Sequence, residues 1–194
     1  MANMASTSYR IVGKKEDLQK IYDLWYEFET KKRKPIEKGS DGNWEGNIAL
    51  ALGIDIEKKY LRGWIETCEF DGDMLKIEAE EAWGVTDFRH CLTESFKDLE
   101  VFFLTEELGC GVFQSNDKDK IFFNYSCLMD IFVNHQSEWE YYDNKEQALT
   151  TAARMLGIEN ITMEEVEKFN EQHEEIGDDD ENYIHLYELQ IVEV

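Results

Sequence analysis

The chain has 194 residues, of which 42% are hydrophobic and 13% aromatic, so it can bury a sizeable core in one large domain or in a domain with an extension. Its net charge is −23, and residues 61–194 hold 33 Asp and Glu against 9 Lys and Arg. This acidity excludes DNA or RNA binding by phosphate neutralisation, disfavours a negatively charged membrane, and leaves a basic host protein as the expected partner. For the acidity itself, a role in keeping the protein in solution is favoured over a role in imitating nucleic acid.

The first sixty residues predict a strand followed by two helices. Residues 6–12 are rich in β-forming side chains and end at Gly13. Apolar residues at helical spacing then predict a long helix: Leu18, Ile21, Tyr22, Trp25 and Phe28. We expect this helix to end at the basic run 31–34 before Pro35, and a short helix to follow over residues 44–52.

Residues 62–79 predict a β-hairpin. Asp71-Gly72 is a strong signal for a two-residue type I′ turn, and this turn places Cys68 opposite Leu75. With that register one face of the hairpin is apolar: Trp64, Cys68, Phe70, Leu75, Ile77 and Ala79. Glu66 is the exception on this face. It could be a functional carboxylate, but we favour a residue at a sheet edge whose carboxylate reaches solvent.

A second helix and two more strands complete the pattern. Thr86 or Asp87 can cap the helix, and residues 100–105 and 112–115 predict strands. Residues 109–111 (GCG) fit a tight turn better than a phosphate-binding loop or a nucleophilic cysteine, because a strand follows them and the local charge is negative. The order predicts an α+β fold of the ferredoxin-like βαββαβ type, an antiparallel sheet with helices on one face.

The last seventy residues predict a smaller α/β part. Residues 121–125 and 129–133 are strand-like. Two helices follow, the first ended by Gly157 and the second opened by a capping box that begins at Thr162. A last strand is predicted over residues 183–192.

Two parts therefore make up the expected organisation. Residues 5–125 form the ferredoxin-like domain, and residues 126–194 form a C-terminal extension with two helices and a last strand, packed on the same core. No apolar stretch is long enough to span a membrane and no signal peptide is visible at the N-terminus, so a cytoplasmic location with free thiols is expected.

No metal or cofactor is expected. The four cysteines show no C-x-x-C spacing, and the four histidines show no H-x-x-x-H or H-E-x-x-H spacing. The run Asp178–Asn182 begins like an EF-hand loop, but it lacks the required glycine, and Leu189 stands where the bidentate Glu should be.

Three segments resemble the YubB ferredoxin-like domain family. They are MANMASTSYRIVGKKEDLQKI, GWIETCEFDGDMLKIEAEEAWG and, above all, TEELGCGVFQSND. The resemblance covers about residues 5–125. It departs at Leu108, where relatives often have proline, and at Ser6 and Thr7, which replace the usual tryptophan and cysteine. It implies the ferredoxin-like fold without an iron–sulfur cluster and an origin on a plasmid, a phage or a conjugative element, but no particular activity.

Acidic and aromatic residues supply the candidate site. Carboxylates near predicted strand ends could hold a divalent cation or perform acid–base chemistry, and exposed Trp and Tyr side chains favour protein interfaces. The candidate interaction residues are Glu80, Glu81, Trp83, Glu106, Glu107, Trp139 and Tyr141. No catalytic residue is predicted.

The favoured hypothesis is a non-enzymatic interaction or regulatory protein of a mobile element, because no catalytic constellation is found. One alternative is an inhibitor that mimics nucleic acid, with rows of carboxylates occupying the groove of a host DNA- or RNA-binding protein. The other is a metal-assisted hydrolase that uses clustered carboxylates.

Overall fold

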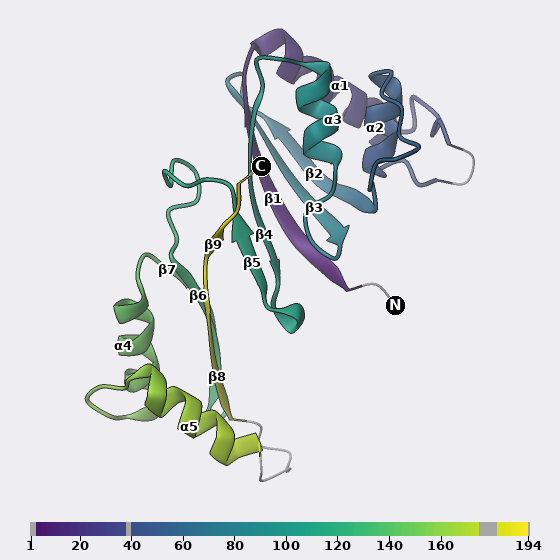
Figure 1. The fold of residues 1–194 in the computed structure, drawn as a ribbon. Helices are drawn as coiled ribbons and strands as arrows, with labels where there is room; N and C mark the ends of the chain where they lie inside the picture. Colours follow the sequence, from purple (N-terminus) through teal and green to yellow (C-terminus); the bar gives the residue numbers. More distant parts are fainter. Residues whose placement is uncertain (1–2, 38–39, 175–181, 194) are drawn as a thin grey trace. The chain divides into compact units, whose positions relative to one another are not determined.

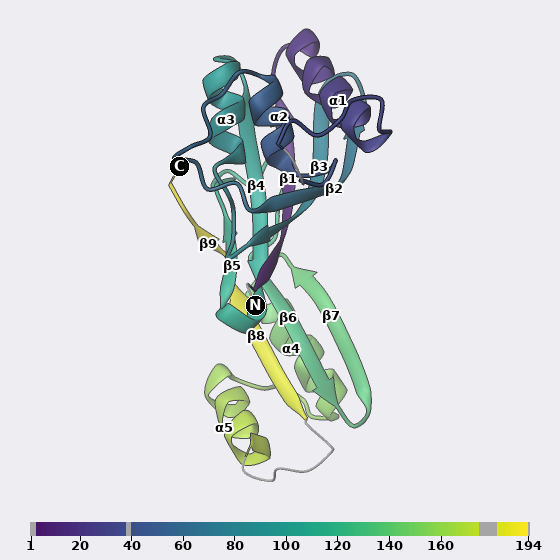
Figure 2. The same cartoon turned by 90° about the vertical axis from the view of Figure 1, so that its right-hand side faces the viewer.

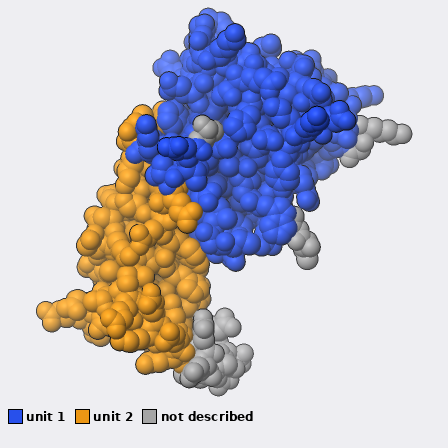
Figure 3. All heavy atoms as spheres, in the orientation of Figure 1, with its two compact units in different colours: residues 1–118, 191–194 blue, residues 119–190 orange. Residues whose placement is uncertain are grey.

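The computed structural model describes residues 3–37, 40–174 and 182–193 and shows an α+β protein with two sheets (Figure 1). The larger sheet has the strand order β2-β3-β1-β4-β5-β9, and the smaller one has the order β7-β6-β8. The chain divides into two compact units, residues 1–118 with 191–194 and residues 119–190 (Figure 3). That the second part packs on the first core stays a prediction.

The first unit follows the predicted order of elements. It contains β1 (Met4–Val12), α1 (Lys15–Glu29), α2 (Glu45–Ala51), β2 (Gly63–Phe70), β3 (Met74–Ala82), α3 (Phe88–Ser95), β4 (Glu100–Glu107), the 3-10 turn η1 (Leu108–Cys110) and β5 (Val112–Ser115). The short β9 (Gln190–Ile191) adds a strand beside β5. β1 is antiparallel to both β3 and β4, and β2 is antiparallel to β3.

The core of the first unit lies between the sheet and its three helices, which cover one face (Figures 1 and 2). Every second residue of β1, including Tyr9 and Ile11, is buried there. The predicted stripe of α1 is confirmed at Leu18, Ile21 and Phe28, which are buried against the same core.

The β2–β3 hairpin forms, but its predicted register is wrong by two residues. Phe70 pairs with Leu75 rather than with Asp73. The Asp71 carboxylate accepts hydrogen bonds from the backbone N–H groups of Asp73 and Met74, at 3.0 and 2.9 Å. Asp71 is thereby held at the first position of the turn, so Gly72 and Asp73 take the two central positions, and Gly72 has the left-handed φ of +103°.

A β-bulge at Glu66 changes which residues of β2 face the core. The register shifts between Ile65 and Thr67, so Ile65 is buried where Trp64 was expected. Cys68 is buried as predicted, and Glu66 is exposed, as the sheet-edge interpretation requires.

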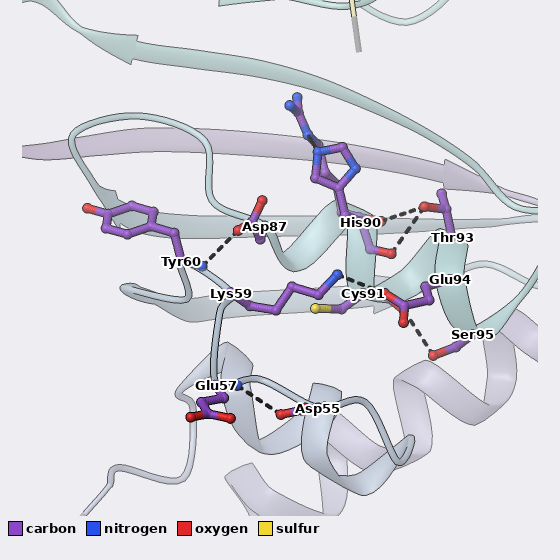
Figure 4. A network of polar contacts seen from close by, with 11 residues as sticks. Asp55, Glu57, Lys59, Tyr60, Asp87, His90, Cys91, Thr93, Glu94 and Ser95 are labelled. Atoms are coloured by element: carbon purple, nitrogen blue, oxygen red, sulfur yellow. Dashed lines mark hydrogen bonds and ion pairs between the residues drawn. The ribbon is translucent and has the colours of Figure 1, made fainter.

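A loop over residues 54–62 holds the start of α3 in place (Figure 4). The Asp87 carboxylate accepts a hydrogen bond from the Tyr60 N–H at 2.7 Å, and the Asp87 N–H donates to the Tyr60 carbonyl at 2.8 Å. Lys59 forms an ion pair with Glu94 on α3 at 2.7 Å. These contacts fix the β3–α3 connection, which supplies Thr86 to the buried cluster described below.

The second unit is a three-stranded antiparallel sheet with two helices. It contains β6 (Cys127–Val133), β7 (Gln136–Tyr142), α4 (Lys145–Leu156), α5 (Met163–Glu174) and β8 (Tyr183–Glu188). The capping box is confirmed, because Glu165 accepts from the Thr162 N–H at 2.8 Å and the Glu165 N–H donates to the Thr162 hydroxyl at 3.3 Å. The first helix ends at Gly157, as predicted.

Three predictions for this part need correction. Residues 121–125 form no strand, whereas β7, which was not predicted, is one of the three strands of the sheet. The predicted last strand is divided at Leu189 into β8 and β9. The acidic run 178–181, with the start of the EF-hand-like sequence, lies outside the described residues.

Candidate functional site

The face of the smaller sheet opposite its helices carries a group of six aromatic rings. Cys127, Met129, Ile131 and Val133 of β6 point to the other face and are buried against α4 and α5. The register places Asp130 between Trp139 of β7 and His185 of β8. We call this surface the aromatic face; its rings, grouped around Asp130, are Phe132, Trp139, Tyr141, Tyr183, His185 and Tyr187.

Ring contacts order this surface. Tyr183 stacks on Phe132 with centroids 6.3 Å apart and on His185 with centroids 4.8 Å apart. The Tyr183 hydroxyl donates to Asp130 Oδ1 at 3.2 Å. Trp139 is 51% exposed and His185 is also exposed, so two π-surfaces beside a carboxylate are open to solvent.

A tight turn sets the register of the aromatic face. Asn134 and His135, the two residues between β6 and β7, both have left-handed φ values of +51° and +63°. Two consecutive left-handed residues form a type I′ turn, whose twist suits a two-residue hairpin. Val133 and Gln136 therefore close the hairpin, which places Trp139 opposite Asp130.

The segment that forms the second unit is strongly acidic in sequence. Residues 119–190 include 18 Asp and Glu but only 4 Lys and Arg, a net charge of −14. Three of the four cations are in ion pairs: Lys145 with Glu188, Arg154 with Glu138 at 3.1 Å, and Lys168 with Glu164 at 2.7 Å. The unit therefore attracts cations, and its exposed rings offer them π-faces.

The candidate residues from the sequence lie in several places. Trp139 and Tyr141 are two residues apart on β7 and share the aromatic face. Glu80 and Glu106 lie in one row across the larger sheet, because both are opposite Ser6 of β1. Trp83, at the end of β3, is 57% exposed with a left-handed φ of +66°.

The two remaining candidates point away from that row. Glu81 lies on the helix-covered face of the larger sheet and is fully buried. Glu107 lies close to Cys110, and a hydrogen bond between them raises the pKa of that exposed thiol. The Asn3 amide also donates to Cys110 Sγ at 2.7 Å. A raised pKa keeps the thiol protonated, which supports the interpretation of this segment as a turn rather than as a nucleophile.

Sequence analysis missed a buried pair of carboxyl groups, Glu45 at the start of α2 and Glu81 on β3. Both are fully buried, together with Tyr9 and Thr86. Gly63 makes the room, since a Cβ at this position would lie 2.7 Å from Glu45 Cδ and 2.9 Å from Glu81 Cγ. One indication was present in the sequence: along β3, Glu81 falls at the alternate positions whose side chains are buried, two residues after Ala79. Glu45 gave none.

The hydrogen-bond geometry of this pair favours a proton shared between the two carboxyls. Thr86 Oγ1 lies 2.6 Å from Glu45 Oε1 and 2.8 Å from Glu81 Oε1, and the Tyr9 hydroxyl donates to Glu81 Oε1 at 2.7 Å. A hydroxyl carries one hydrogen, so the second Thr86 contact needs a carboxyl that is protonated. Burial, together with the negative charge of Glu81, raises the pKa of Glu45 well above its ordinary value.

Within residues 3–37, 40–174 and 182–193, no three or more His, Cys, Asp and Glu side chains gather in a way that could hold a metal ion. None of the helices described has the length and apolar character needed to cross a bilayer. The four cysteines are free thiols.

Comparisons with known proteins give no assignment: no family model, no curated protein and no solved structure matches the chain.

Proposed function

We propose that this protein is a non-enzymatic interaction module that binds a basic polypeptide through the aromatic face. One observation carries the proposal: the helix-free side of the smaller sheet gathers six rings around Asp130 in a unit with a net charge of −14. A sheet face that only had to meet water would be served by small polar side chains. An exposed Trp and half-buried Tyr side chains beside a carboxylate instead match what protein interfaces use as anchors.

An arginine side chain fits this chemistry well. Its guanidinium can stack on Trp139 while donating hydrogen bonds to Asp130, which lies opposite in the register. A cation–π contact contributes about 0.5–1 kcal/mol at an exposed site and about 2 kcal/mol when desolvated. The acidic surroundings add long-range attraction, which speeds encounter with a basic partner and weakens with salt.

The larger unit is proposed to be a ferredoxin-like scaffold related to the YubB family and of mobile-element origin. The strand order β2-β3-β1-β4, with antiparallel neighbours throughout, supports the ferredoxin-like part of this proposal. The fold serves many functions, so it adds no activity to the proposal. The function rests on the aromatic face.

Calorimetric titration with an arginine-rich peptide tests the proposal. We expect binding that weakens as salt is raised, and Trp139→Ala should reduce the affinity about tenfold, equivalent to about 1.4 kcal/mol. Trp83→Ala is the matched control, because Trp83 is similarly exposed but belongs to the other unit. Absence of binding, or equal losses from the two variants, would overturn the proposal.

A further inference from the structure

We infer that the partner binds as an added β-strand along the edge of β7, with its basic side chains over the aromatic face. This inference rests on the proposed function and specifies the way in which the basic polypeptide is held. β7 is an edge strand, since the order of the smaller sheet is β7-β6-β8. Extended peptides bind such edges through main-chain hydrogen bonds, while pockets for alternate side chains give specificity.

The register shows which backbone groups of β7 point outward. In a two-residue hairpin the closing pair, Val133 and Gln136, is hydrogen-bonded, and hydrogen-bonded pairs then alternate along the ladder. Ser137 and Trp139 fall in the other pairs, opposite Phe132 and Asp130. Their N–H and C=O groups therefore point away from β6. Across the described residues, these two residues have no backbone hydrogen bond beyond the strand ladder.

The opposite edge of the same sheet is already occupied. Asn170 of α5 donates from its side-chain amide to the Ile184 carbonyl at 2.8 Å, and its carbonyl oxygen accepts from the Ile184 N–H at 2.9 Å. The side chain thus satisfies both outward groups of Ile184, as a neighbouring strand would. An incoming strand is blocked at β8, which leaves β7 as the edge for addition.

The side chains of β7 determine which strand can join it. The outward-bonding residues Ser137 and Trp139 have their side chains on the aromatic face, so a partner residue paired with Trp139 would place its own side chain there. The edge has none of the protection that lysine, proline or a bulge gives other edges. Glu138 and Glu140 disfavour pairing with a second copy of this acidic strand.

Backbone methylation of the peptide separates strand addition from other modes of binding. The probe is a decapeptide of alternating arginine and threonine. In antiparallel addition, a residue opposite Trp139 has both its N–H directed at β7 and its side chain on the aromatic face. N-methylation of the arginines should therefore reduce affinity at least tenfold, whereas N-methylation of the threonines should leave it within about twofold.

A protein variant gives an independent measurement. Ser137→Pro removes an outward N–H that the hairpin does not use, so the sheet should remain folded by circular dichroism while affinity falls at least tenfold. Ser137→Ala is the control and should bind like the wild type. If both methylated peptides bind as well as the parent peptide, strand addition is wrong and the proposed function stands. If the parent peptide does not bind, the proposed function itself fails.

Discussion

Replacement of Glu45 by glutamine should make the first unit more stable at neutral pH. Glu45 and Glu81 are fully buried and share Thr86 as a hydrogen-bond partner. Glutamine keeps the shape of the side chain and can donate from its amide to the neighbouring oxygens, which removes the need for a bound proton. In the wild-type protein that proton must be taken from solvent when the chain folds.

The sign and size of the effect follow from proton linkage. The pKa of Glu45 is raised in the folded state by burial and by Glu81, so the native chain binds more protons than the unfolded chain above the ordinary pKa of 4.5. Stability must then fall as pH rises from that value to the folded pKa, with a limiting slope of about 1.4 kcal/mol per pH unit for one proton. Glu45→Gln removes this contribution, so its advantage should be near zero at acidic pH and should grow toward pH 8.

Tryptophan fluorescence can follow the first unit alone. Four of the five tryptophans lie in it, and Trp139 is the only one in residues 119–190, so the comparison is made in a Trp139→Phe background. Urea unfolding at several values between pH 5 and 8 gives the free energy of unfolding for each variant. A Glu45→Gln protein that kept the wild-type pH slope, or that was less stable at pH 8, would refute the shared proton.

Two further predictions concern stability. Gly63→Ala should destabilise the first unit by about 1–3 kcal/mol in the same fluorescence assay, because the added Cβ would collide with the buried carboxyl side chains. Adding Glu45→Ala should recover most of this loss of stability. An unchanged loss in the double variant would contradict the steric explanation. Asn170→Ala should lower the free energy of unfolding of the second unit by about 1–3 kcal/mol and speed hydrogen exchange at the Ile184 amide, because both hydrogen bonds to the Ile184 backbone are lost. Unaltered exchange at this amide would show that the Asn170 side chain does not protect it.

The elements of the first unit could be predicted because its segments have clear periods. The helical stripe of α1 and the alternation in β1 and β3 each report burial directly. The register of the β2–β3 hairpin could not be predicted, because it depends on which residue occupies the first position of the turn. That choice is made by the Asp71 carboxylate, and the compensating bulge at Glu66 is a backbone feature that leaves the composition of the strand unchanged.

The second unit was harder to predict because β7 breaks the usual pattern. Glu138 and Glu140 lie on the side of the sheet that the helices cover, where the Glu138 carboxylate accepts hydrogen bonds from Tyr142 and Arg154. The strand therefore has polar residues at the positions where a buried strand usually has apolar ones. The turn before it is Asn134-His135, and histidine is a weak signal for the left-handed conformation that it adopts. Trp139 and Tyr141 were nevertheless candidates, because exposed aromatics among acids suggest an interface from composition alone.

Stability alone gives no reason for the composition of the aromatic face. A three-stranded sheet with two helices needs one covered face, and the core formed by β6, α4 and α5 supplies it. Rings on the other face expose apolar surface, which favours association and is a cost unless a partner covers it. The unit places such rings beside an edge that lacks lysine, proline or a bulge, and its sequence carries a strong negative charge. The charge repels other copies of the same chain and attracts a basic strand, so one property limits self-association and selects the partner.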